Sequence, residues 1–116
     1  MKPKIYGIRN CDTMKKAFAW FDARKIAYEF HDYKKEGVPP GKLKEWAGRA
    51  GWDKLANTRG PTWRKIPEAQ RQSPTEARAL ALLAQNTSAI RRPIVESGSE
   101  LLIGFDPAEY AATLRR

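Results

Sequence analysis

The chain has 116 residues, of which 22 are Lys or Arg and 13 are Asp or Glu, so its formal net charge is +9. This length fits one compact domain that buries a hydrophobic core without disulfide or metal staples. The one cysteine excludes an internal disulfide, which favours a reducing, cytoplasmic setting. No stretch approaches the about 20 apolar residues that span a bilayer, so we expect a soluble, unprocessed protein with no membrane partner.

The excess of positive charge favours anionic partners, among them oxyanions, acidic proteins and nucleic acid. The basic residues are scattered, however, and nowhere form a long run of like charges. A solvated basic surface is therefore the better interpretation, and we expect no direct contact with nucleic acid. His31 is the only histidine, which excludes a metal site built on two histidines, and we expect no metal.

The N-terminal part predicts a strand, a helix and a second strand. Residues 4–8, "KIYGI", have the character of a short strand, and a helix follows from about Asp12 to Lys25. Four apolar side chains share one face of this helix: Met14, Ala17, Phe18 and Phe21. Residues 26–30, "IAYEF", alternate as a strand does. A unit of this kind closes right-handed with its two strands parallel.

Turn formers in "KKEGVPPG" separate this unit from a mostly helical middle. A helix that ends at Gly51 carries an apolar stripe: Leu43, Trp46, Ala47 and Ala50. Residues 52–72 show little periodicity, so we expect a loop there with at most a short helical turn. Ser73 as the cap and Pro74 at the first position begin another helix. Its predicted buried stripe is Ala77, Leu80, Ala81 and Ala84.

The C-terminal part predicts a hairpin and a final helix. Apolar runs at residues 94–95 and 101–103 flank a Gly/Ser turn, and Asp106 then caps a helix whose first residue is Pro107. The element order predicts an α/β fold, with a mixed four-stranded sheet flanked by helices in a single domain. In such a sheet a ligand binds outside the carboxyl end of the first strand. Cys11 follows that strand.

Cys11 is the main candidate for chemistry. The thiolate is the nucleophilic form of cysteine, and unpaired N–H groups and the dipole at a helix start favour it. Lys15 in the following turn adds favourable charge, whereas Asp12 opposes it. The other interpretation is a small buried hydrophobe, which describes most lone cysteines. The polar neighbours Asn10 and Asp12 make a reactive thiol and a buried hydrophobe about equally well supported. The residues alone do not decide between these two interpretations.

Three stretches of the chain carry a resemblance to a known family: "YGIRNCDTMKKAFAWF", "NTRGPTWRKI" and "RRPIV…GSELLIGFDPAEY". In this order and spacing, over nearly the whole chain, they resemble the ArsC/Spx/YffB family, and most closely its YffB branch. The resemblance implies a thioredoxin-like fold with a helical insertion. We therefore expect one thioredoxin-like domain over residues 1–116, with residues 38–90 as the insertion.

The resemblance also implies roles for particular residues. Members related to arsenate reductase use a cysteine at the position of Cys11 as nucleophile toward an oxyanion, which arginines stabilise. Arg59 in "NTRG" and Arg92 in "RRPI" match two of those arginines, and the forked donors of a guanidinium suit such anions. The peptide bond before Pro93 is typically cis in this fold and lies beside the thiol.

Two departures from the family pattern narrow the function. Phe105 stands where arsenate reductases carry a third arginine, which counts against arsenate reduction. Met14 stands at the second cysteine of the Cys-x-x-Cys switch that Spx regulators carry, which excludes an internal disulfide switch. A site with a single thiol needs a second thiol from solution, and glutathione is the abundant cytosolic candidate.

We therefore expect a glutathione-dependent thiol reductase related to arsenate reductases, with Cys11 and Arg92 as its catalytic residues. The expected substrate-binding residues are Asn10, Asp12, Thr13, Lys15, Arg59, Trp63 and Pro93. Glutathione or another anionic thiol or disulfide is the expected substrate, and no bound cofactor is expected. Two alternatives stay open: a Spx-like regulatory module that binds an acidic protein without turnover, and an arsenate reductase.

Overall fold

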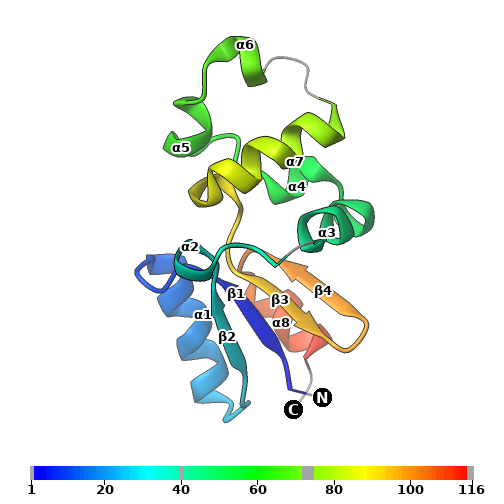
Figure 1. The fold of residues 1–116 in the computed structure, drawn as a ribbon. Helices are drawn as coiled ribbons and strands as arrows, with labels where there is room; N and C mark the ends of the chain where they lie inside the picture. Colours follow the sequence, from blue (N-terminus) through cyan, green and yellow to red (C-terminus); the bar gives the residue numbers. More distant parts are fainter. Residues whose placement is uncertain (1, 40, 72–74, 115–116) are drawn as a thin grey trace. The chain divides into compact units, whose positions relative to one another are not determined.

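The computed structural model describes residues 2–39, 41–71 and 75–114 (Figure 1). The chain forms two compact units. The first, the sheet unit, comprises the described residues up to Glu36 and from Arg92 onward, and the second, the helical unit, comprises Gly37–Arg91. One domain with residues 38–90 as an insertion stays a prediction. Among the described residues, no helix combines the length and apolar character that crossing a bilayer requires.

The described part of the sheet unit contains four short strands: β1 (Lys4–Gly7), β2 (Glu29–Asp32), β3 (Ile94–Ser97) and β4 (Glu100–Ile103). Their order across the sheet is β2-β1-β3-β4 (Figure 1). β1 is parallel to β2 and antiparallel to β3, and β4 is antiparallel to β3. The predicted mixed four-stranded sheet is therefore confirmed. The two central strands of the sheet, β1 and β3, come from opposite ends of the chain, and Ile5 of β1 lies opposite Val95 of β3.

Helices α1 (Asp12–Ala23) and α8 (Pro107–Thr113) pack against one face of this sheet. Side chains alternate along a strand, which turns Ile5, Val95 and Leu102 toward the two helices. The buried members of this core are Ile5, Met14, Trp20, Phe21, Ile26, Val95, Leu102, Tyr110 and Leu114. The rings of Trp20 and Tyr110 meet edge to face with centroids 5.4 Å apart, so α1 and α8 are in direct contact.

The predicted apolar face of α1 is largely confirmed. Met14, Ala17 and Phe21 are buried, whereas Phe18 is only half-buried. The prediction missed Trp20, which is buried on the same helix. The second strand exists as predicted, but it was predicted to begin at residue 26, three residues too early, since pairing with β1 begins at Glu29. The partner strand, and not the apolar run, decides where a strand begins.

The helical unit has these described elements: α3 (Lys42–Ala50), α4 (Trp52–Leu55), α5 (Pro61–Arg64), α6 (Glu68–Arg71), α7 (Glu76–Gln85) and the 3₁₀ turn η1 (Thr87–Ala89). Trp46 is buried on α3 as predicted, and Gly51 ends that helix with a φ of 92° that glycine adopts without steric cost. An isolated antiparallel bridge between Ala56 and Ile90 joins distant parts of this unit.

The predicted buried stripe of α7 was wrong. The buried side chains are Ala79, Leu82 and Leu83. The predicted ones are exposed, apart from the half-buried Leu80: Ala77, Leu80, Ala81 and Ala84. Both sets have helical spacing, but the observed set buries more apolar area because it contains two leucines.

The predicted start of α1 at about Asp12 is confirmed, although its N-cap residue Cys11 makes no side-chain hydrogen bond to the helix. Asp106 caps α8 and Pro107 is its first residue, as predicted. The predicted start of α7 at Ser73 and Pro74 lies outside the described residues, and Thr75 is the cap that the structure describes. Residues 52–72, predicted to be mostly loop, contain α4, α5 and α6. Each is about one turn long, which is too short to produce a periodic pattern.

Candidate active site

Cys11 lies where the chain passes from β1 into α1. It is the N-cap residue of α1, with an extended backbone (φ −149°, ψ 135°), and its carbonyl accepts a hydrogen bond from the N–H of Lys15 over 2.9 Å. Its side chain is half-buried against the core of the sheet unit. The sulfur therefore stands at the positive end of the helix while keeping some contact with solvent.

Arg92 supplies a positive charge next to this sulfur. Its Nε donates a hydrogen bond to Cys11 Sγ over 3.3 Å. The peptide bond between Arg92 and Pro93 is cis, as the resemblance predicts. The carbonyl of Pro93 accepts a hydrogen bond from the N–H of Gly104 over 2.8 Å, and β3 begins at the next residue. Pairing of β3 with β1 thus brings the arginine to the cysteine.

The pKa of the Cys11 thiol lies below its ordinary value of 9.0. Partial burial alone raises this pKa, because a charged sulfur loses solvation. The hydrogen bond from Arg92, the backbone N–H groups of Met14 and Thr13, and the charge of Arg92 together outweigh burial. The site therefore favours the thiolate, which is the nucleophilic form.

Tyr33 was not among the predicted site residues. It begins the short helix α2 (Tyr33–Glu36), directly after β2, and is fully buried. The guanidinium of Arg92 donates a hydrogen bond to its hydroxyl, and burial raises the pKa of Tyr33 to about 12. No sequence pattern signals this contact, because the two residues meet only through the order β2-β1-β3 in the sheet.

Apolar side chains fill the two positions at which the chain departs from the patterns of the family that it resembles. Met14 is fully buried in the core of the sheet unit. Phe105 is partly buried, and its ring meets that of Tyr110 edge to face with centroids 5.1 Å apart. Phe105 directly follows Gly104, which is bonded to Pro93. Phe105 thus follows a residue whose backbone is bonded to the loop that carries Arg92, while its own ring packs on Tyr110.

The predicted site residues fall into both units. In the sheet unit, Asn10, Asp12 and Lys15 are exposed close to Cys11 along the chain, while Thr13 is half-buried and Pro93 is buried. The roles of these residues in binding a substrate stay predictions. The backbone N–H of Thr13 does contribute to the lowered pKa of Cys11.

Arg59 and Trp63 belong to the helical unit. Arg59 is exposed in the turn that precedes α5. Trp63 is buried on α5, and its ring stacks on that of Trp52 with centroids 6.2 Å apart. Their predicted roles in binding a ligand of Cys11 stay predictions.

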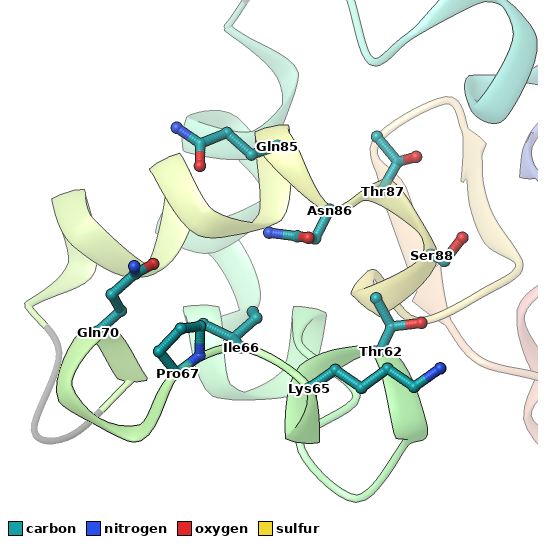
Figure 2. Close-up of a pocket in the computed structure, with 9 residues that line it drawn as sticks. All are labelled: Thr62, Lys65, Ile66, Pro67, Gln70, Gln85, Asn86, Thr87 and Ser88. Atoms are coloured by element: carbon teal, nitrogen blue, oxygen red, sulfur yellow. The ribbon is translucent and has the colours of Figure 1, made fainter.

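The helical unit also contains an open hollow of about 610 Å³ (Figure 2). Amide and hydroxyl side chains form most of its wall. The lining residues are Thr62, Lys65, Ile66, Pro67, Gln70, Gln85, Asn86, Thr87 and Ser88. None of them is a predicted site residue, and none is a cysteine or histidine, so this hollow offers no nucleophile comparable to Cys11.

The strand order and the cysteine at the start of α1, beside a cis-proline loop, define a thioredoxin-like protein of the single-thiol kind. The model of the ArsC family matches residues 6–113. The chain belongs to the ArsC family, and the predicted resemblance is confirmed.

Individual relatives are similar to this chain over nearly its whole length. An uncharacterized protein from Haemophilus influenzae is 41% identical over 108 residues, which cover 93% of this chain and 95% of that protein. The solved structure of a protein named YFFB has a TM-score of 0.94 and 45% identity, covering 97% of this chain and 99% of that one. The global transcriptional regulator Spx of Listeria innocua is 25% identical over 114 residues, which cover 97% of this chain and 86% of that protein.

Proposed function

We propose that the chain is a cytoplasmic thiol–disulfide oxidoreductase that uses Cys11 as its nucleophile and glutathione as its co-substrate. The observation that carries this proposal is the 3.3 Å hydrogen bond from Arg92 Nε to Cys11 Sγ. It stabilises a thiolate on a side chain that is only half-buried, so a disulfide in solution can reach the sulfur. Membership of the ArsC family supports the same class of chemistry.

In the first step the Cys11 thiolate attacks the glutathione sulfur of a mixed disulfide between glutathione and a substrate thiol. A bond forms between Cys11 Sγ and that sulfur, the original S–S bond breaks, and the substrate leaves as a thiolate that takes a proton from water. A second glutathione, as its thiolate, then attacks the adduct on Cys11. Oxidised glutathione leaves, and the Cys11 thiolate is restored. The substrate sulfur is reduced, and the two glutathione sulfurs end as one disulfide.

The second thiol comes from solution because the chain has one cysteine. Glutathione is a net anion at neutral pH, and arginine binds carboxylates through paired N–H donors. We assign its carboxylates to Arg92 and Lys15 in the sheet unit, and the role of Arg59 stays a prediction from the resemblance. The remaining proposed contacts in the sheet unit are Asn10, Asp12, Thr13 and Pro93, and the role of Trp63 stays a prediction from the sequence.

Mass spectrometry of the full chain after incubation with oxidised glutathione tests this proposal. The wild-type chain is expected to gain one glutathione, and reduced glutathione is expected to remove it. The Cys11→Ser chain is the matched control and is expected to gain none. A wild-type chain that stays unmodified contradicts the proposal, as does a Cys11→Ser chain that catalyses glutathione–disulfide exchange at the wild-type rate.

A second candidate function is a regulatory module that binds an acidic protein without turnover. The similarity to Spx over 97% of the chain and the net charge of +9 favour it. In that case Cys11 is dispensable, and the affinity for the partner falls steeply as salt screens the charges. Arsenate reduction is disfavoured because Phe105, whose ring packs on Tyr110, stands where the resemblance places a third anion-binding arginine.

A further inference from the structure

Tyr33 is a fully buried, titratable side chain that the proposed reaction does not use. The preceding residue, Asp32, holds the turn in which Tyr33 lies. Asp32 Oδ1 accepts hydrogen bonds from the N–H groups of Lys34 and Lys35, over 3.0 and 3.3 Å. Such an Asx turn holds the backbone at the start of α2. The Tyr33 hydroxyl is therefore placed by contacts that do not depend on the cysteine.

Arg92 holds two acceptors at once. Its Nε donates to Cys11 Sγ over 3.3 Å, and its guanidinium also donates to the Tyr33 hydroxyl. An arginine side chain has many rotamers, but its planar fork becomes fixed when two of its donors are engaged. The buried phenol therefore limits the positions that the guanidinium takes around the sulfur.

A neutral acceptor is better suited than a charged one to hold the Arg92 guanidinium beside a thiolate. Burial raises the pKa of Tyr33 to about 12, so the hydroxyl accepts a hydrogen bond without carrying a negative charge near pH 7. A carboxylate in the same place would compete with the thiolate for the positive charge of Arg92. The charge of Asp32 acts on Tyr33, while Asp12 and Lys15, which are near Cys11 along the chain, are exposed on α1.

We propose that Tyr33 is a positioning residue, whose hydroxyl holds the Arg92 guanidinium against Cys11 Sγ and so keeps the sulfur in its nucleophilic form. The role of Tyr33 in turnover rests on the proposed function. Its effect on the thiol does not, because the ionisation of Cys11 is measurable without any substrate.

The test is the rate of iodoacetamide alkylation of Cys11 against pH in the full chain. Tyr33→Phe is expected to move the midpoint of this profile to higher pH and to slow alkylation at pH 7 by about three- to tenfold, the factor that a hydrogen bond typically contributes to an equilibrium. The rate at alkaline pH, where the thiolate is fully formed, is expected to stay within about twofold of wild type. A general loss of structure would also move the midpoint upward, toward the ordinary cysteine value of 9.0, so the profiles are compared only for variants whose circular dichroism matches that of the wild-type chain.

Tyr110→Phe is the matched control. Tyr110 is equally buried, and its hydroxyl donates to the carbonyl of Gly104 over 2.7 Å, so this change also removes one buried hydrogen bond. Its profile is expected to keep the wild-type midpoint. The double variant Tyr33→Phe with Arg92→Gln is expected to match Arg92→Gln alone, because Tyr33 acts through Arg92. The proposal is overturned if Tyr33→Phe leaves the midpoint unmoved. It is also overturned if Tyr33→Phe moves the midpoint as far in the Arg92→Gln chain as it does in the wild-type chain.

A measurement on the wild-type chain covers the case in which Tyr33→Phe does not fold. The ¹³C resonance of Tyr33 Cζ is expected to shift when the Cys11 thiol titrates, and to lose this step once Cys11 is alkylated. A resonance indifferent to Cys11 overturns the positioning role. Failure of the glutathione adduct alone leaves these outcomes in place, so it overturns only the proposed function.

Discussion

Gly7 lies directly against Met14: a Cβ atom added to Gly7 would stand 2.6 Å from Met14 Sδ and 2.7 Å from its Cε. Gly7 is the last residue of β1, and Met14 lies in the first turn of α1. The absence of a side chain at Gly7 therefore allows the helix that begins at Cys11 to approach the strand closely.

Gly7→Ala is expected to destabilise the chain by about 1–3 kcal/mol, because the buried Met14 side chain must move. Gly48→Ala is the control: a Cβ at Gly48 meets nothing within 4 Å, and in a helix interior this change stabilises by about 0.5–1 kcal/mol. Denaturant unfolding of both variants measures the difference. In a Met14→Ala chain the cost of Gly7→Ala should shrink, and an undiminished cost would show that the contact is not its cause.

The charge of Arg92 is expected to control the reactivity of Cys11. Arg92→Gln removes the cation and raises the thiol pKa toward 9.0, so alkylation at pH 7 is expected to slow by roughly tenfold. Arg91→Gln removes an exposed positive charge one position earlier and is expected to change the rate little. Equal effects of the two substitutions would show that general surface charge, and not the hydrogen bond, lowers the thiol pKa.

The stability of the chain is expected to fall in alkaline solution through Tyr33. Its pKa is about 12 in the folded chain, above the ordinary value of 10.0, so unfolding above pH 10 releases a proton. The stabilisation is fully present below pH 10 and is lost as the pH rises toward 12, at about 1.4 kcal/mol per pH unit. Urea unfolding between pH 9 and about 11.5 should give a shallower decline for Tyr33→Phe. An identical slope in both chains would contradict a raised pKa at Tyr33.

Phe105 is expected to set the response of the site to oxyanions. Phe105→Arg adds a guanidinium beside the Arg92–Pro93 loop and removes a ring contact worth about 0.5–1.5 kcal/mol. Arsenate should then slow the alkylation of Cys11 in Phe105→Arg, with little effect on the wild-type chain. Phe105→Leu removes the ring without adding charge and serves as the control. Protection of the wild-type thiol by arsenate would favour the arsenate reductase alternative.

The sequence predicts the sheet and the place of Cys11 well, because both follow from local signals. A tight junction between strand and helix puts Cys11 at a helix start, and Asp106 with Pro107 marks the start of α8. Periodicity alone fails on α7, where two stripes with the same spacing compete and the one with more apolar area is buried.

The contacts between the side chains of the candidate site are harder to predict from the sequence. Arg92 enters the prediction only through a resemblance, since nothing local ties it to a cysteine 81 positions away. Tyr33 has no local signal at all, because its burial and its contact with Arg92 depend on which strands are neighbours. Such long-range partners follow from the topology of the sheet and not from the pattern of any one segment.

The central place of β3 beside β1 has a consequence for the growing polypeptide. During synthesis Cys11 leaves the ribosome long before Arg92 does. Until β3 has been made and has paired with β1, the Arg92 guanidinium does not stand beside Cys11. A nascent chain therefore lacks the largest of the contributions that lower the thiol pKa, and the sulfur reaches its full reactivity only once translation has passed β3.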